Sequence, residues 1–167
     1  PADALRDYAL FDGLLAWFSA HYCIDPQRVF VVGHSLGASF ANSLACARGR
    51  VIRGLGSLGG GVNASACTGE VAAMVLHNPD DRLVDFSHGE KVRDLWLEVN
   101  GLQDEEPVPV RPRYLNCRRY GGPETVNPLV WCPHDQDFSS RGRYYPHTWP
   151  RGTGEAIMGF FARLPGP

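Results

Sequence analysis

The segment 33–37, with the sequence GHSLG, most restricts how this chain can fold. It follows an apolar, β-branched run at residues 28–32 and precedes a helix-like stretch at residues 38–47. A strand that passes into a helix through a glycine-flanked serine makes a sharp turn, because larger flanking side chains would clash. Such a turn places the Ser35 hydroxyl at the carboxyl end of a buried strand, beside free N–H groups of the helix. Ser35 is therefore the candidate nucleophile.

Strands and helices alternate along most of the 167 residues. The alternation predicts an α/β fold with a mainly parallel sheet and helices on both faces. Residues 1–167 are expected to form a single domain. The periodicity of apolar residues predicts helices at 4–21, 36–47, 87–99 and 154–164, and strands at 28–32, 51–58, 71–76, 113–119 and 128–132.

Composition excludes several classes of partner. The chain has 16 basic and 18 acidic residues and a formal net charge of −2. No basic stripe indicates nucleic acid binding, and no apolar run approaches the length of a membrane span. We expect no cofactor, no nucleic acid partner and no membrane partner. The chain contains no signal-peptide pattern and indicates no particular oligomeric state.

The five cysteines are widely spaced and fit no zinc pattern. They are either buried free thiols or part of a disulfide-bearing secreted enzyme. In a parallel sheet, Cys23, Cys46 and Cys67 would lie toward the edge opposite the nucleophile, so any two of them could pair. Cys117 and Cys132 flank a turn-rich segment and are placed to bridge a hairpin. The fifth cysteine would then need a partner outside this chain.

A serine nucleophile needs a base within hydrogen-bond reach and a carboxylate that orients the base. The predicted strand 71–76 runs into Asp80 and Asp81, at the sheet edge where Ser35 is expected. Either aspartate can serve as the acid, and the other then caps the following turn. We favour Asp81 as the acid.

Six histidines compete for the role of base. His21 lies at the wrong end of a strand, His88 begins a surface helix, and His34 sits within the elbow itself. His77 closes a strand, where packing is sufficient to explain it. The two late histidines, His134 and His147, both follow the serine and the aspartate along the chain, the order Ser, Asp, His of one large hydrolase class. We favour His147.

Two alternative interpretations of nearby residues stay open at this point. His134, Asp135, Asp137 and His147 could form a metal site, but their spacing matches no familiar motif, and a solvated loop explains them better. The glycine run 59–61 lies at the same sheet edge. It is either a flexible loop or a source of N–H groups for an oxyanion.

Four stretches of the sequence resemble the α/β-hydrolase family that contains polyhydroxybutyrate depolymerase-like enzymes and feruloyl and acetylxylan esterases. They are residues 22–30 (YCIDPQRVF) leading into the elbow, 67–69 (CTG), 77–101 and the pair WC at 131–132 with HTWP at 147–150. The HTWP box and the YCIDP lead-in are more specific than the elbow. The resemblance covers the C-terminal portion of the family's domain, and implies that its N-terminal half is not in this sequence.

The resemblance implies a secreted serine esterase with Ser35 as nucleophile, Asp81 as acid and His147 as base. The Leu36 N–H, directly after the nucleophile, is the candidate oxyanion donor. His34 and Trp149 are candidate substrate-site residues, and Trp149 either packs against the acyl group or is simply a core tryptophan. The substrate would be a small or polymer-linked ester, either an aromatic or acetyl ester of plant polysaccharides or a polyester. The alternatives are a lipase, a prolyl-oligopeptidase-like peptidase, or an inactive hydrolase fragment or binding module.

This sequence departs from the family pattern at Asn78 and Pro146, where glycine is usual. The missing half of the family domain would also supply a second oxyanion donor.

Overall fold

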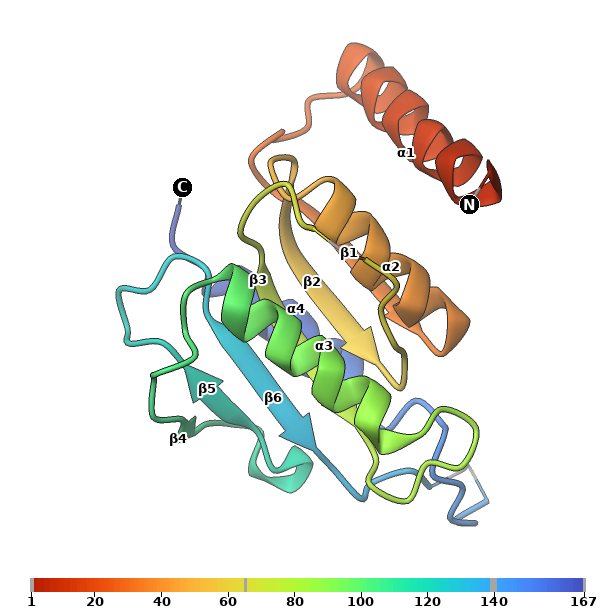
Figure 1. The fold of residues 1–167 in the computed structure, drawn as a ribbon, viewed down its shortest axis with the longest axis vertical. Helices are drawn as coiled ribbons and strands as arrows, with labels where there is room; N and C mark the ends of the chain where they lie inside the picture. Colours follow the sequence, from red (N-terminus) through yellow and green to blue (C-terminus); the bar gives the residue numbers. More distant parts are fainter. Residues whose placement is uncertain (1, 65, 139–140, 167) are drawn as a thin grey trace.

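The computed structural model describes residues 2–64, 66–138 and 141–166. Four α-helices, one 3-10 helix and six strands follow one another in this part of the chain (Figure 1). In chain order the elements are α1 (Ala2–His21), β1 (Val29–His34), α2 (Leu36–Ala47), β2 (Ile52–Leu58), β3 (Ala72–His77), α3 (Phe86–Val99), β4 (Val108–Pro109), η1 (Arg113–Leu115), β5 (Arg118–Tyr120), β6 (Leu129–Pro133) and α4 (Thr153–Ala162).

The six strands form one mixed sheet in the order β1-β2-β3-β6-β5-β4. Strands β1, β2, β3 and β6 are parallel, whereas β5 and β4 extend the sheet in antiparallel fashion. The register pairs His34 with Leu58, and His77 with Pro133. The carboxyl ends of the four parallel strands therefore finish at the same edge of the sheet, as the sequence predicts.

Helices cover both faces of the sheet, so the predicted α/β architecture is confirmed. Helices α2 and α3 lie on one face and share one buried apolar cluster, while α4 lies on the other face over a second cluster (Figure 1). The small residues Ala38, Ala41 and Ala45 are buried, and they let α2 lie close to the sheet as predicted. On the other face, a Cβ at Gly56 would lie 2.7 Å from the Ile157 side chain, so α4 also packs closely.

The segment predicted as a strand at 113–119 is only partly one. Residues Arg113–Leu115 form the 3-10 helix η1, and the strand β5 begins at Arg118. Asn116 ends η1 in the left-handed conformation, with φ of 53°. Leu115 is fully buried in the cluster under α4. The turn places Leu115 in the core, and the pattern of apolar residues does not reveal it.

Helix α1 forms as predicted but packs less than its apolar residues suggest. It lies outermost, beside α2 (Figure 1). The Tyr8 ring lies 5.8 Å from that of Phe40, and Arg48 pairs with Asp12 at 2.7 Å. In contrast, Leu5, Leu10, Leu14 and Phe18 are all exposed. No helix among the described residues is both long and apolar enough to cross a membrane.

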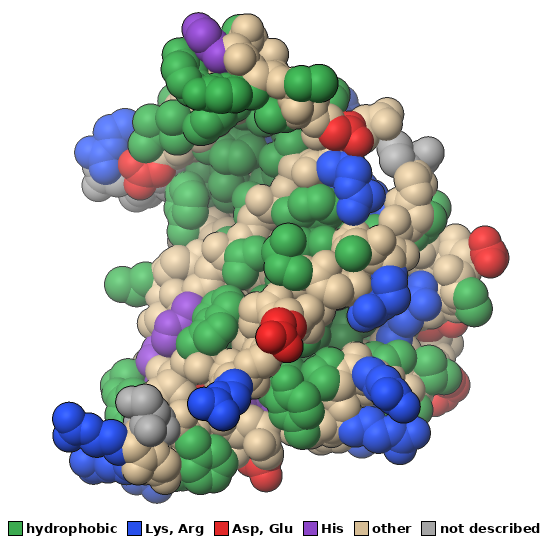
Figure 2. Space-filling view, turned by 180° about the vertical axis from the view of Figure 1, so that it is seen from behind, with side chains coloured by type: hydrophobic (Ala, Val, Ile, Leu, Met, Phe, Trp, Pro, Cys, Tyr) green, Lys and Arg blue, Asp and Glu red, His purple; other side chains and the backbone are tan. Residues whose placement is uncertain are grey.

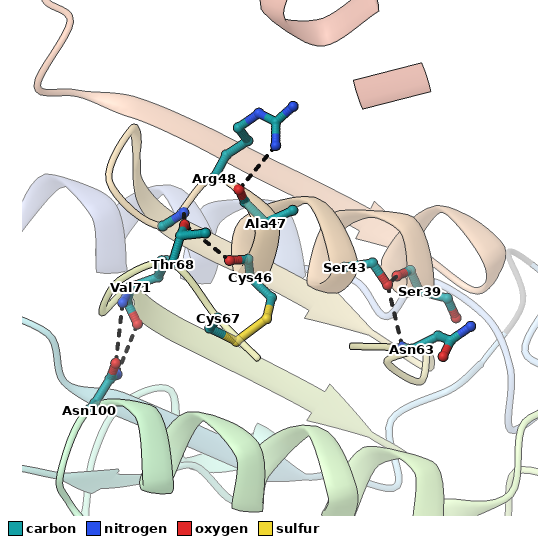
Figure 3. The surroundings of a disulfide bond; sticks show 11 residues. Ser39, Ser43, Cys46, Ala47, Arg48, Asn63, Cys67, Thr68, Val71 and Asn100 are labelled. Carbon is teal, nitrogen blue, oxygen red and sulfur yellow. Dashed lines mark hydrogen bonds between the residues drawn. A yellow bond between two sulfur atoms is a disulfide. The ribbon is translucent and has the colours of Figure 1, made fainter. Parts of the chain in front are cut away.

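Two disulfides join the cysteines of the core. Cys46 near the end of α2 pairs with Cys67 of the loop before β3, where the Thr68 N–H also donates to the Cys46 carbonyl at 2.9 Å (Figure 3). Cys117 pairs with Cys132 across the β5–β6 hairpin, as the sequence suggests. Cys23 is a free, exposed thiol. The interpretation as five free thiols is therefore wrong.

We expect the double substitution Cys46→Ala with Cys67→Ala to lower the free energy of unfolding by about 3 kcal/mol. The disulfide closes a loop with a sequence separation of 21 residues, and a closed loop of this size restricts the unfolded chain by roughly that amount. Urea unfolding without reductant measures the difference. Cys23→Ala is the matched control and should unfold at the same urea concentration as the unaltered chain. Equal midpoints for the control and the double variant would contradict the prediction.

Candidate active site

The elbow between β1 and α2 holds Ser35 in a strained backbone conformation. Ser35 has φ of 58° and ψ of −123°, in a region that residues other than glycine rarely adopt. Its N–H donates to the Leu58 carbonyl at 3.0 Å, and its carbonyl accepts from the Ser39 N–H at 3.0 Å. Strand β2 and helix α2 therefore hold the turn in place.

The two glycines of the elbow differ in the space around them. A Cβ at Gly33 would lie 2.2 Å from the Gly37 carbonyl oxygen, so glycine is required there. A Cβ at Gly37 would meet no described atom within 4 Å. The predicted clash is therefore confirmed at Gly33 and wrong at Gly37, because Gly37 lies on the open side of the helix N-terminus.

Three side chains from distant parts of the sequence form a hydrogen-bonded chain at the carboxyl edge of the sheet. The His147 Nε2 lies 2.8 Å from the Ser35 Oγ, and the His147 Nδ1 lies 2.6 Å from the Asp81 Oδ2. Because an ionised carboxylate only accepts, Nδ1 carries the proton and Nε2 is free to accept from the serine hydroxyl. This arrangement can draw the proton from Ser35 during attack on an electrophile.

The Asp81 carboxylate is buried and held from several directions. Its Oδ1 accepts from the N–H groups of Leu83 and Val84, at 2.9 and 3.0 Å. The buried His77 lies beside it, with Nε2 3.5 Å from the Asp81 Oδ2, and the same nitrogen donates to the Val84 carbonyl at 2.9 Å. His77 thus supports the turn that presents Asp81, a contact that the strand pattern does not indicate.

The alternative candidates lie elsewhere. Asp80 is exposed and accepts from the Tyr144 hydroxyl at 3.1 Å. His134 is buried at the end of β6, while His21 and His88 are exposed. Among the residues that the structure describes, no group of three or more His, Cys, Asp or Glu side chains is arranged to hold a metal ion. In the suggested metal cluster, both ring nitrogens of His147 are already engaged by Ser35 and Asp81.

The loop that carries His147 is held by a polar network around the buried Asn78 and Asp137, which the sequence does not reveal. The network comprises Asn78, Asp80, Asp137, Tyr144 and Thr148. Asp137 accepts from the Asn78 amide at 2.8 Å and from the Thr148 hydroxyl at 3.2 Å, and the Asn78 amide also donates to the Tyr144 hydroxyl at 3.0 Å. Burial raises the pKa of Asp137, although the hydrogen bonds from Asn78 and Thr148 oppose that rise. The network joins the His147 loop to the end of β3.

The ring of His34 lies beside the imidazole of His147, and the ring of Trp149 lies beside that of His34. The rings of His34 and His147 have centroids 5.1 Å apart, and Trp149 meets His34 edge-on at 6.2 Å. Burial lowers the pKa of His34, and the neighbouring His147 lowers it further. His34 is therefore neutral near pH 7. Trp149 is 40% exposed, so part of its ring is open to a ligand.

The segment 59–61 is buried, not a flexible surface loop. The Gly59 N–H donates to the Leu76 carbonyl at 2.9 Å, and the Gly61 N–H donates to the Ser39 hydroxyl at 3.0 Å. Neither group is free for an oxyanion. By contrast, the Leu36 N–H begins α2, where the first N–H groups have no acceptor within the helix.

Comparison with known proteins identifies the relatives of this chain. A protein of Neurospora crassa named feruloyl esterase D is 31% identical over 168 residues, a match that covers 95% of this chain and 56% of that protein. The chain is thus similar in sequence to feruloyl esterases over nearly its whole length. A probable feruloyl esterase C of Aspergillus terreus is 31% identical over 104 residues, which cover 60% of this chain and 38% of that protein. No protein-family profile matches the chain.

Solved structures agree on the fold. The chain superimposes on an acetyl xylan esterase from Aspergillus awamori with a TM-score of 0.67 at 14% identity, covering 93% of this chain and 67% of that one. A thermostable esterase gives a TM-score of 0.64 at 14% identity, covering 94% of this chain and 36% of that one. The expected esterase-type α/β fold is thereby confirmed. The chain spans about half the length of the first curated relative, or 56%.

We expect acid to lower the free energy of unfolding of this chain through His134. Burial lowers the pKa of His134 from 6.5 to about 4, so the unfolded chain takes up its proton first. The stability that the neutral imidazole contributes is present above pH 6.5 and is lost as the pH falls to about 4. The lowered pKa of the buried His77 acts in the same direction, and the raised pKa of Asp137 opposes both.

The His134 contribution should amount to about 3 kcal/mol over this interval. Urea unfolding from neutral pH down to about pH 4 measures it. In His134→Gln the fall in stability should be smaller by roughly that amount, while the exposed-site control His21→Gln should follow the unaltered chain. Parallel pH profiles for all three proteins would contradict the assignment.

Proposed function

We propose that this chain is the part of a serine esterase that carries the catalytic residues, with Ser35, His147 and Asp81 as nucleophile, base and acid. The observation that carries the proposal is the single imidazole held between the Ser35 hydroxyl at 2.8 Å and the Asp81 carboxylate at 2.6 Å. Homology to esterases supports the reaction class. We further propose that residues 1–167 form one domain, the C-terminal portion of the catalytic domain.

In the proposed reaction, the Ser35 oxygen attacks the ester carbonyl carbon while the His147 Nε2 takes the hydroxyl proton. Asp81 holds the Nδ1–H tautomer and stabilises the imidazolium that forms. When the tetrahedral intermediate collapses, the C–O bond to the alcohol breaks and His147 returns the proton to the leaving oxygen. Water, deprotonated by the same imidazole, then attacks the acyl carbon. The C–O bond to Ser35 breaks, His147 returns the proton to the Ser35 oxygen, and the carboxylic acid leaves.

The Leu36 N–H supports the oxyanion in this proposal. It stands at the start of α2, directly after the nucleophile, where the helix dipole also favours negative charge. The Gly59 and Gly61 N–H groups are occupied within the fold, so they do not supply a second donor. The loss of one donor typically costs about 10²–10³ in turnover, so a chain with Leu36 alone would turn over slowly.

For the substrate we propose aromatic or acetyl esters of plant polysaccharides. The relatives named feruloyl esterase and the structural neighbour named acetyl xylan esterase support these two acyl groups. The part-exposed ring of Trp149, edge-on to His34, supports the aromatic acyl group. Polyesters are the second candidate. The two disulfides and the homology support secretion.

The triad assignment is tested by fluorophosphonate labelling and by hydrolysis of p-nitrophenyl acetate. Ser35→Ala should abolish labelling, and Asp81→Asn and His147→Gln should lower the hydrolysis rate by about 10⁴, because the correctly oriented base is lost. Asp135→Asn and His21→Gln change exposed residues and should retain full labelling. A folded, unaltered chain that is not labelled would favour an inactive hydrolase fragment instead. Cleavage of a peptide but no ester would favour a peptidase.

The proposed contact between the Trp149 ring and an aromatic acyl group is tested with Trp149→Ala. We expect kcat/KM for a feruloyl ester to fall about tenfold more than kcat/KM for an acetyl ester, because only the aromatic acyl group packs against the ring. Trp17→Ala, on the outer helix α1, is the matched control and should change neither value. An equal fall for both esters would show that Trp149 supports the fold around His147 and does not select the acyl group.

A further inference from the structure

A second concave site lies on the α4 face of the sheet. A cavity of about 270 Å³ opens between α4 and the antiparallel strands. Its floor is apolar and includes Met74 of β3, Val130 of β6 and Phe160 of α4, all members of the core cluster beneath α4. Figure 2 shows this face, with hydrophobic side chains between groups of Lys and Arg over the part of the molecule that carries β4 and β5.

Three arginines line the same cavity. They are Arg111 before η1, Arg119 of β5 and Arg163 at the end of α4, and none of the lining residues is acidic. Within the described ranges no carboxylate pairs with any of the three guanidinium groups. Arg119 stands directly opposite Val130 in the sheet, so its side chain starts from the floor. Its Nη2 donates to the Gly122 carbonyl at 2.7 Å, but its Nε is buried without an acceptor.

This arginine pocket is separate from the Ser35 site. Pro128, just before β6, and Pro165, just after α4, also line it. The Pro165 carbonyl accepts from Arg53, near the start of β2, at 2.9 Å. The pocket therefore extends toward the amino ends of the parallel strands, whereas Ser35, Asp81 and His147 stand at their carboxyl ends. None of the three lines the pocket.

Three arginines without a described carboxylate partner, beside an apolar floor, favour one kind of ligand. The planar guanidinium matches a carboxylate with two parallel hydrogen bonds, and the apolar floor gains from covering a hydrocarbon body. Inorganic phosphate would use the arginines but leave the floor uncovered. The volume of about 270 Å³ lies at the lower end of small-molecule sites, which limits the ligand to a small acid.

We propose that the arginine pocket binds a small monocarboxylate with an apolar body, held by Arg119 and Arg163 with Arg111 at the rim. The proposal does not depend on the esterase assignment, because no residue of the Ser35 site takes part. Among the described residues that line the pocket, none has a nucleophilic or acid–base group at neutral pH, so the proposal is for binding and not for a reaction.

Amide NMR of the 18.4 kDa chain tests the proposal, because it reports both affinity and location. Cinnamate is titrated to millimolar concentration, with cinnamamide as the neutral analogue and inorganic phosphate as the anion without an apolar body. We expect cinnamate to shift the amides of Val130, Ala156 and Arg163. Cinnamamide and phosphate should each bind about tenfold more weakly or not at all.

Arg119→Gln and Arg163→Gln should each weaken cinnamate binding by about tenfold. Arg118→Gln is the matched control, since the adjacent residue of β5 points to the opposite face and does not line the pocket. Arg163 is exposed on the surface of α4, so its variant remains informative if Arg119→Gln does not fold. Shifts confined to Ser35 and His147, equal binding of cinnamamide, or no shifts would each overturn the proposal.

Discussion

The backbone of Ser35 is the constraint on which the rest of this structure depends. A non-glycine residue in such a conformation costs about 1–3 kcal/mol, and the surrounding fold must compensate for it. The absent Cβ at Gly33 lets α2 start within contact of β1, and the hydrogen bonds to Leu58 and from Ser39 fix both sides of the turn. Flattening of this turn would move the hydroxyl away from the imidazole of His147. The parallel sheet and its close-packed helices together hold Ser35 in this unfavourable conformation.

The imidazole side of the site is held in a different way. His147 lies in a loop without regular secondary structure, and buried side-chain hydrogen bonds fix its position. Asp137 binds Thr148 and Asn78 together, and Asn78 follows directly after β3, three residues before Asp81. The base His147 and the acid Asp81 are thus both positioned by the carboxyl end of β3. Unpaired polar groups inside a fold are costly, so such a network is stable only when its members are all satisfied.

The order of strands and helices and the elbow could be predicted from the sequence, because periodicity determines which residues meet at one sheet edge. Chain order left two aspartates and two histidines as candidates beside Ser35, and the family resemblance favours Asp81 and His147 among them. The support around them could not be predicted. Asn78, Asp137 and Tyr144 have the composition of a solvated loop, and only the tertiary fold shows that Asp137 is buried. His77 looks like a strand residue and supports Asp81. For helix α1 the sequence misleads in the opposite sense, because its apolar residues indicate a buried face whereas Leu5, Leu10 and Leu14 are exposed.

Strand β1 stands at the end of the sheet, and among the described strands it pairs with β2 alone. The strand that leads into Ser35 is therefore hydrogen-bonded along one side only, and the exposed Val32 lies three residues before the nucleophile. The backbone groups on the outer side of β1 are thus left without a strand partner in the described sheet, and they offer an edge on which a further strand could pair directly beside the nucleophile.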